Sequence, residues 1–223
     1  MARDTRDTRV RPLRSSDVPA SAALHLDVLG AEFLARGGEK FLRRYHAAWL
    51  ASPFAMTLGA VDEDGQLLGA LLGTVSPRAH YQRMFRDHGA ALALALLERS
   101  VLSPRFGFEL LATRGVRYAR AVALQLVPAR RGQAGPVPTP GRQVGEVTHL
   151  MVAPEAQGKG VGRALVEEAE RVARAAGLDE LVLVTPPDLP ARQFYEHLGW
   201  QESGELRSRS GEVFVRYRLS LGQ

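Results

Sequence analysis

The chain has 223 residues, of which 45% are hydrophobic and 24% charged, and a chain of this size can form one domain around a single core. It has no cysteine, which excludes disulfides, thiolate metal sites and a cysteine nucleophile. The net charge is only +5 and the arginines are interspersed with acidic residues, so we expect no nucleic-acid partner. No apolar run reaches about 18 residues and no signal-peptide core opens the chain. We therefore expect a cytoplasmic protein without a membrane partner.

The first third of the chain predicts helices and strands in alternation. Residues 1–9 lack an apolar period and are expected to form a flexible tail. The apolar patterns that follow predict a strand at 10–14, a helix from a Ser15-Ser16-Asp17 cap to about Leu29, a helix at 39–50, and a hairpin of strands at 54–61 and 67–75.

Residues 76–145 are the least regular part of the chain. Their first half has a helical period and is apolar enough to pack on other elements, whereas 130–145 is rich in Pro, Gly and Arg and predicts a linker. Residues 119–127 fit a strand or a helix equally well. This segment either determines specificity, or it extends the core or forms a homodimer contact.

A strand, a glycine-rich turn and a helix follow. The strand at 147–152 ends at Pro154, and the turn Gln157-Gly158-Lys159-Gly160-Val161-Gly162-Arg163 opens an amphipathic helix that ends near Gly177. Glycines and unpaired amides at a helix N-terminus favour a bound phosphate. The turn fits neither the P-loop nor the dinucleotide spacing. The alternative is a tight strand-to-helix turn without a ligand.

Two motifs resemble the GNAT superfamily of N-acetyltransferases. The first is Gln157-x-x-Gly160-x-Gly162 after the 150–154 strand end, which is similar to the family's pyrophosphate motif. The second is the strand at 181–184 followed by 191–200, which resembles the family signature A-x-x-F-Y-E-x-x-G-F. The resemblance is close over 144–200, looser over 10–75, and does not explain the segment between.

The resemblance implies the fold and the function. We expect an α/β domain over 10–220, with a mixed, mostly antiparallel sheet, helices on both faces, and a helical insertion at about 76–145 between strands 3 and 4. The implied reaction transfers an acetyl group from the co-substrate acetyl-CoA, by direct attack, to the amine of a small molecule, an aminosugar or a peptide. The alternative is a non-catalytic acyl-CoA sensor or scaffold.

The resemblance also implies the residues that contact CoA. They are Leu150, Met151, Val152, Gln157, Gly158, Lys159, Gly160, Val161, Gly162, Arg163 and Asp188. Asp188 stands where many relatives carry Asn, and a carboxylate cannot donate the hydrogen bond that an amide donates.

Three catalytic roles need candidates. Tyr195 matches the family's tyrosine that faces the CoA sulfur and would be the proton donor; its alternative is a core aromatic. Glu146 begins the motif strand and would act as the base through water, and the Val152 amide would bind the oxyanion. Strand alternation points His149 away from Glu146, which indicates a structural histidine. The other histidines are scattered in the sequence, so we expect no metal.

Overall fold

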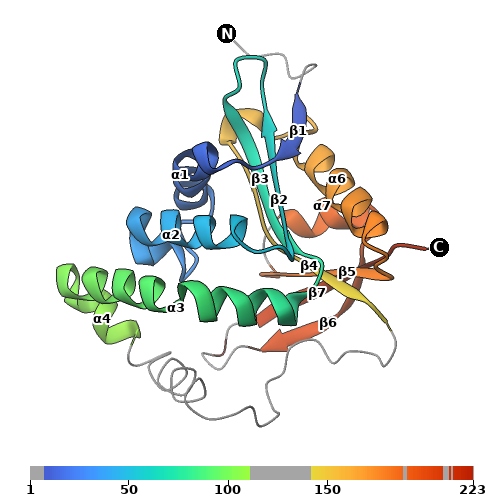
Figure 1. The fold of residues 1–223 in the computed structure, drawn as a ribbon. Helices are drawn as coiled ribbons and strands as arrows, with labels where there is room; N and C mark the ends of the chain where they lie inside the picture. Colours follow the sequence, from blue (N-terminus) through green and yellow to red (C-terminus); the bar gives the residue numbers. More distant parts are fainter. Residues whose placement is uncertain (1–7, 111–141, 188–189, 208–210, 212, 223) are drawn as a thin grey trace.

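The computed structural model describes residues 8–110, 142–187, 190–207, 211 and 213–222. Within these residues, seven strands form one sheet in the order β1-β2-β3-β4-β5-β7-β6 (Figure 1). The strands are β1 (Arg9–Pro12), β2 (Ala55–Val61), β3 (Leu67–Thr74), β4 (Val144–Val152), β5 (Glu180–Thr185), β6 (Gln201–Arg207) and β7 (Val213–Ser220). The pair β4–β5 is parallel and the other five pairs are antiparallel. The predicted mixed, mostly antiparallel sheet is confirmed.

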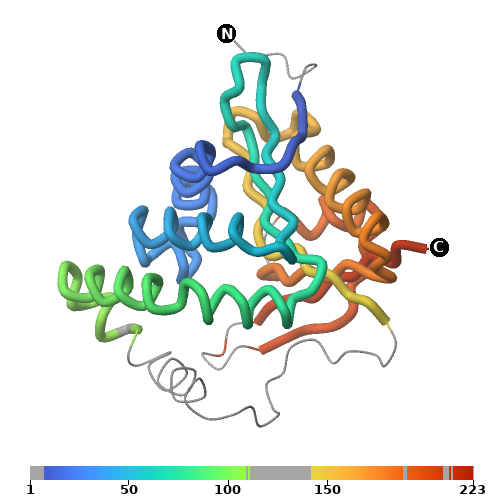
Figure 2. Tube along the Cα trace, viewed as in Figure 1, coloured from blue at the N-terminus to red at the C-terminus, as the bar shows by residue number. Residues whose placement is uncertain are grey.

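Helices cover both faces of the sheet (Figure 2). They are α1 (Val18–Val28), α2 (Gly38–Leu50), α3 (Pro77–Leu102), α4 (Pro104–Leu110), α6 (Val161–Ala175) and α7 (Ala191–His197), with single 3-10 turns η2 (Ser15–Asp17), η3 (Ala35–Gly37) and η5 (Pro154–Ala156). Helices α1 and α2 pack on β2, β3 and β4 from one side, and α6 packs on β1 to β4 from the other. No described helix has the length and apolarity needed to cross a bilayer.

The apolar stripe of α6 explains why this helix lies flat on the sheet. Val161, Leu165, Ala169 and Ala173 recur every four residues and are all buried, as the helical period predicts. Gly69 in β3 lets the helix come close, because a Cβ there would lie 3.0 Å from both Leu165 and Val161 side-chain atoms. Complete burial of the Leu165 side chain contributes about 2 kcal/mol to the free energy of unfolding. The packing fixes the start of α6 against the end of β4.

Helices α3 and α4 form the described part of the expected insertion, and they confirm its helical first half. Four apolar α3 side chains are buried, namely Met84, Leu92, Ala95 and Leu96. Other apolar side chains of the pair are exposed, including Leu97, Val101, Leu102 and Phe108. The helices therefore extend the core and also present an apolar surface. Residues 111–141, which include the undecided segment 119–127 and most of the expected linker, lie outside the described residues.

Two strands were not predicted from the sequence. β6 and β7 form an antiparallel hairpin, and β7 pairs along the whole of β5. In β6 nearly every residue is exposed and Leu206 is the one apolar residue, so its sequence lacks the alternation that indicates a half-buried strand. The hairpin completes the sheet on the far side of β5.

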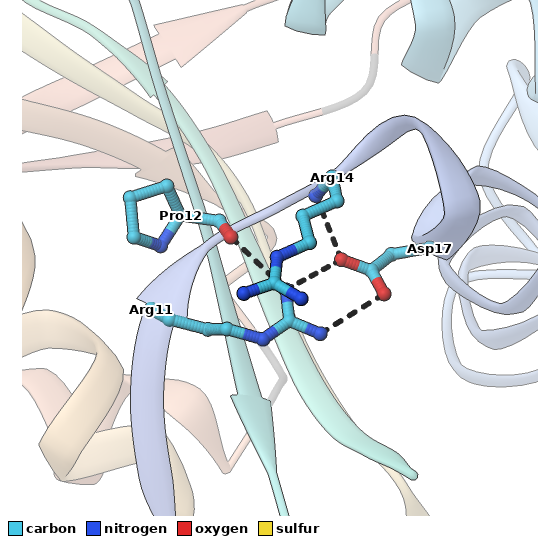
Figure 3. A network of polar contacts seen from close by, with 4 residues as sticks. All are labelled: Arg11, Pro12, Arg14 and Asp17. Atoms are coloured by element: carbon cyan, nitrogen blue, oxygen red, sulfur yellow. Dashed lines mark hydrogen bonds and ion pairs between the residues drawn. The ribbon is translucent and has the colours of Figure 1, made fainter. Parts of the chain in front are cut away.

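The expectation that Ser15-Ser16-Asp17 caps the first helix is wrong for the side chain of Asp17. Asp17 makes no side-chain capping bond to α1. Instead its Oδ2 accepts hydrogen bonds from Arg14 N, at 2.7 Å, and Arg11 Nη1, at 2.6 Å, while its Oδ1 accepts one from Arg11 Nη2 at 3.0 Å (Figure 3). Arg11 Nη1 also donates to the Pro12 carbonyl at 3.0 Å. The bidentate pair therefore fastens β1 to the start of α1.

Replacing Asp17 with asparagine is expected to lower the free energy of unfolding by about 1–2 kcal/mol at neutral pH, because the substitution breaks a little-exposed bidentate pair. The hydrogen bonds from Arg11 lower the pKa of Asp17. Its stabilisation is therefore complete above the pKa of an unfolded aspartate, about 3.9, and is lost as the pH falls through the lower folded value. Urea unfolding of both proteins from pH 7 to pH 3 measures this difference. Asp27→Asn, at an exposed position of α1, is the control and should show neither effect.

Candidate active site

The parallel strands β4 and β5 diverge halfway along β4. Their pairing begins at Val144 opposite Glu180 and ends at Val147 opposite Leu183. β4 continues to Val152, and beyond Val147 it pairs with β3 alone among the described strands. One backbone edge of β4 therefore faces a gap in the middle of the sheet.

The direction of the β4 amides follows from one hydrogen bond. Ala153 N donates to Leu68 O at 2.9 Å, on the β3 side. Successive residues of a strand direct their N–H and C=O groups to opposite sides. The amides of Val152 and Leu150 therefore face the gap, and that of Met151, whose side chain is fully buried, faces β3. The gap is lined with backbone donors at the two positions where an extended ligand could pair.

Gln157 closes the far end of this gap. Its Nε2 donates to Val152 O at 3.1 Å. The side chain thus holds the turn that follows β4 against the strand end. Gln157 can therefore serve the site by positioning the glycine turn, and this role needs no direct contact between its side chain and a bound ligand.

The glycine turn leads directly into α6. Gly158 and Gly160 have φ values of 71° and 86°, a region that favours glycine, and a Cβ at either position would have no atom within 4 Å. Gly160 is the N-cap of α6 and no side chain caps it. The first bond of the helix runs from Ala164 N to Gly160 O, at 3.0 Å, so the helix leaves three preceding amides unpaired, those of Val161, Gly162 and Arg163. The turn therefore presents amides and a helix dipole to the space above it.

Gly162 joins the two motifs in space. A Cβ at Gly162 would lie 3.4 Å from a Phe194 ring carbon and 3.5 Å from Val152 Cγ2. The start of α6, the start of α7 and the end of β4 therefore meet at one place. Of the two cations of the turn, Arg163 lies 3.9 Å from Glu167, and Lys159 is half-buried. Asp188 lies outside the described residues.

Glu146 lies near the start of β4, where the two parallel strands still pair. Burial raises the pKa of its carboxyl. The hydroxyls of Tyr81 and Thr148 donate to its Oε1 at 3.4 Å and 3.5 Å. At Thr148 the pairing with β3 slips by one residue, since Leu72 faces His149 and Gly73 faces Val147; such bulges often lie next to active sites. A half-buried carboxylate with a raised pKa and long hydrogen bonds has the properties of a general base.

Sequence reasoning did not identify Tyr81. This residue lies in the first turns of α3, in the part of the chain that the family resemblance does not explain. The pairing of Thr74 with Glu146 is the signal that could have found it, because α3 begins three residues after Thr74 and therefore starts beside Glu146. The insertion thus contributes a side chain to the candidate site.

Tyr195 is almost completely buried in α7. Its ring centroid lies 5.1 Å from that of Phe194, 5.7 Å from that of Trp200 and 6.2 Å from that of Tyr217. Burial raises the pKa of its phenol, so the hydroxyl stays protonated at neutral pH. No described contact joins Tyr195 to Glu146. The position suits both a proton donor and a core aromatic.

The polar residues of the second motif anchor α7 to the terminal hairpin. Arg192 Nε donates to Tyr217 OH at 3.2 Å, and Tyr217 OH donates to Glu196 Oε1 at 2.9 Å. Arg192 also forms an ion pair with Glu202 at 2.8 Å. These contacts give Arg192 and Glu196 a structural role, because they hold α7, the helix that carries Tyr195, against the terminal hairpin.

The bulge at Thr148 breaks the strand alternation, so the expectation that His149 points away from Glu146 is wrong: both side chains lie on the face of β4 that α1, α2 and α3 cover, where Glu146 meets Tyr81. His149 is buried. Its Nε2 forms a hydrogen bond of 3.1 Å with Tyr45 OH. The sequence separates His25 and His46 from it by more than 100 residues, but the fold brings the three rings together beneath β4. Distance in the sequence therefore does not keep these three rings apart in the fold.

Comparisons with known proteins agree with this arrangement. Residues 111–200 match the model of the acetyltransferase (GNAT) family. A mycothiol acetyltransferase from Beutenbergia cavernae is 45% identical over 62 residues, which are 27% of this chain and 21% of that protein. The matched segment thus spans about a fifth of the length of that curated relative.

Solved structures of low sequence identity share the fold. A GCN5-related N-acetyltransferase from Kribbella flavida has a TM-score of 0.57 at 17% identity, over 97% of this chain and 99% of that one. A spermidine N-acetyltransferase chimera from Vibrio cholerae and hSSAT has a TM-score of 0.58 at 14% identity, over 96% of both chains. The match to the family model therefore assigns residues 111–200 to the acetyltransferase (GNAT) family, and the solved structures share the fold of the chain.

Proposed function

We propose that this protein transfers an acetyl group from acetyl-CoA to a primary amine by direct attack. The observation that carries the proposal is the edge of β4 that no described strand pairs, which leads to the N-terminus of α6, where no side chain caps the helix. The edge offers hydrogen bonds to an extended chain, and the helix N-terminus attracts an anion. Pantetheine and pyrophosphate have these two properties and are joined in one molecule.

The backbone holds the co-substrate in this proposal. The amides at the start of α6 bind the pyrophosphate, and the Gly158 and Gly160 conformations leave room for it. The Leu150 and Val152 peptide groups pair with pantetheine as a neighbouring strand would. The Val152 amide then donates to the thioester oxygen and stabilises the negative charge that develops on it.

Side chains move the protons. Glu146, through a water molecule, takes a proton from the ammonium form of the acceptor, and the neutral amine attacks the thioester carbon. The C–N bond forms, the C–S bond breaks, and Tyr195 donates its proton to the departing sulfur; the second amine proton then returns to the phenolate through solvent. The chain has no cysteine, in agreement with attack without a cysteine-bound acyl intermediate.

The acceptor is an amine of a small molecule, an aminosugar or a peptide. Tyr81 lies against Glu146, so α3 borders the place where an amine would be deprotonated. We propose that the insertion selects the acceptor. The fold itself does not, since relatives with this fold differ in the acceptors that their names give.

The proposal is tested by the release of CoA thiol from acetyl-CoA, with and without a panel of amines that includes polyamines, aminosugars, nucleotide aminosugars, aminoglycosides and peptides. Acceptor-dependent release, together with a product heavier by one acetyl group, would establish the reaction. Calorimetric binding of CoA without release for any amine would favour an acyl-CoA sensor. Failure to bind CoA would exclude both functions.

Replacing Tyr195 with phenylalanine is expected to lower kcat about 100-fold and to leave the Kd of CoA unchanged. Loss of a general acid costs about 10²–10⁴-fold, and the lower figure applies because a thiol has a pKa near 8.5 and its thiolate leaves readily. Steady-state kinetics and CoA titration measure the two quantities. Phe194→Leu, beside it in α7, is the control for packing. If Tyr195→Phe lowered only the thermal stability, Tyr195 would be a core aromatic.

A further inference from the structure

Three buried histidines from three elements meet on the α1–α2 side of β4. His25 comes from α1, His46 from α2 and His149 from β4, and none exposes more than 6% of its surface. The ring centroid of His25 lies 5.2 Å from that of His46 and 4.7 Å from that of His149. The proposed acetyl transfer makes no use of this group.

Hydrogen bonds engage both nitrogens of His46 and one nitrogen each of His25 and His149. Ser21 Oγ lies 2.8 Å from His46 Nδ1, and His46 Nε2 lies 3.0 Å from His25 Nδ1. His149 Nε2 lies 3.1 Å from Tyr45 OH. A consistent proton assignment places protons on His46 Nδ1, His25 Nδ1 and His149 Nε2, so that each donates outward. The remaining nitrogens, His25 Nε2 and His149 Nδ1, then present lone pairs.

These two remaining nitrogens have no hydrogen-bond partner within the described parts of the chain. A buried polar atom left unpaired costs about 1–3 kcal/mol, so two such atoms at one place need an explanation. They point to the same space as the carboxylate of Glu32, whose Oε2 lies 3.8 Å from His149 Nδ1. All three ligand atoms, from His25, Glu32 and His149, lie within 4.8 Å of one another.

We propose that His25, His149 and Glu32 form a binding site for a divalent transition-metal ion of the zinc class. Two imidazole nitrogens and one carboxylate oxygen are ligands that such ions take, with a fourth position left for water. Around a tetrahedral ion, ligand atoms bound at about 2.0–2.1 Å lie about 3.3 Å apart. The observed separations therefore need to contract by about 1.5 Å at most, and the Glu32 side chain, which is 41% exposed, can move.

The surroundings have the features of an outer coordination shell. Metal-bound histidines usually donate their second N–H to a fixed acceptor, which sets the tautomer and the ring orientation. His46 and Tyr45 occupy those positions here. Burial lowers the pKa of His25 to about 4, which keeps the ring in the neutral form that binds metals.

The ion would fasten a loop to the sheet. Glu32 lies between α1 and η3, a segment without regular secondary structure, whereas His149 is held in the middle of β4. Binding would therefore tie this loop and α1 to the strand that carries Leu150 and Val152. The proposal is independent of acetyl transfer, since it depends on no residue of the proposed reaction.

The experiment uses the full chain without an affinity tag, stripped with a chelator and then titrated with Zn²⁺ against a chromophoric competitor. We expect one ion per chain, a rise in melting temperature on binding, and a visible ligand-field spectrum of four-coordinate geometry with Co²⁺. Glu32→Gln, at a half-exposed position, should weaken Zn²⁺ binding about 100-fold or more. His25→Gln should abolish the Co²⁺ spectrum.

His80→Gln is the matched control. His80 is also fully buried, its Nδ1 is held at 2.9 Å from Ser52 Oγ and its Nε2 has no hydrogen-bond partner in the described ranges, but it does not belong to a group of ligands. This variant should bind Zn²⁺ as the unmodified chain does. The proposal is overturned if the unmodified chain binds no Zn²⁺, or if Glu32→Gln binds it with unchanged affinity.

Discussion

Glu146→Gln is expected to lower kcat/KM for acetyl transfer about 1,000-fold, because glutamine cannot accept a proton from the amine and loss of a general base costs about 10²–10⁴-fold. Folding should not suffer. Burial raises the pKa of Glu146, so the folded state holds the ionised carboxylate at a cost that the variant avoids. Steady-state kinetics and urea unfolding of the two proteins separate the effects. A variant with full activity would remove Glu146 from the reaction.

The pH profile provides a second test of the same residue. A base acts when it is deprotonated, so kcat/KM should fall as the pH falls through the raised pKa of Glu146, above the ordinary value of about 4.3. The hydrogen bond from Tyr81 favours the carboxylate and lowers this pKa. Tyr81→Phe should therefore move the acidic limb of the profile to higher pH while activity at high pH is retained. An unmoved limb would mean that another group titrates there.

Gly160→Glu is expected to weaken CoA binding about 1,000-fold. The new carboxylate would lie near the pyrophosphate, and two charges about 4 Å apart at a protein surface repel each other by about 4 kcal/mol. Isothermal titration with CoA measures the loss. Addition of salt should restore part of the affinity, since the repulsion is electrostatic.

Gly177→Glu separates this effect from backbone strain. Gly177 follows the other end of α6 with a φ of 73°, against 86° at Gly160, and in both places a Cβ would have no atom within 4 Å. Both variants should lose about 1–2 kcal/mol of stability, because side chains are strained in this conformation. Only Gly160→Glu should lose CoA binding. Equal losses in the two variants would contradict the phosphate site.

The unit from β4 to α7 could be predicted from the sequence because its signals are local. The spacing of Val161, Leu165 and Ala169 reflects one helix face, and the glycines that open α6 have the positive φ values that only glycine adopts easily. β6 could not be predicted, because its residues are exposed on both faces and carry no period. An element can be predicted from the sequence where its backbone conformation requires a particular residue, such as glycine, or where one buried face imposes a period on the apolar residues.

The candidate site was predictable in its main-chain part and less so in its side chains. The amides at Leu150 and Val152 follow from strand geometry. The contacts of Tyr81 with Glu146 and of Tyr45 with His149 join residues 65 and 104 positions apart. No pattern within a short stretch of sequence indicates such contacts, because they depend on how α2 and α3 pack against the sheet.

The divergence of β4 and β5 places a sheet edge at the centre of the protein. Sheet edges usually lie at the periphery of a protein and are short or covered, because the free N–H and C=O groups of an unpaired strand can bind any extended chain. Here the edge without a described partner strand is short, because it runs only from the paired residues Val147 and Leu183 to the end of β4, where Gln157 is bound. Recognition through peptide groups also makes few demands on the side chains of the strand. The sequence of such a site is therefore free to drift over evolution while its geometry persists.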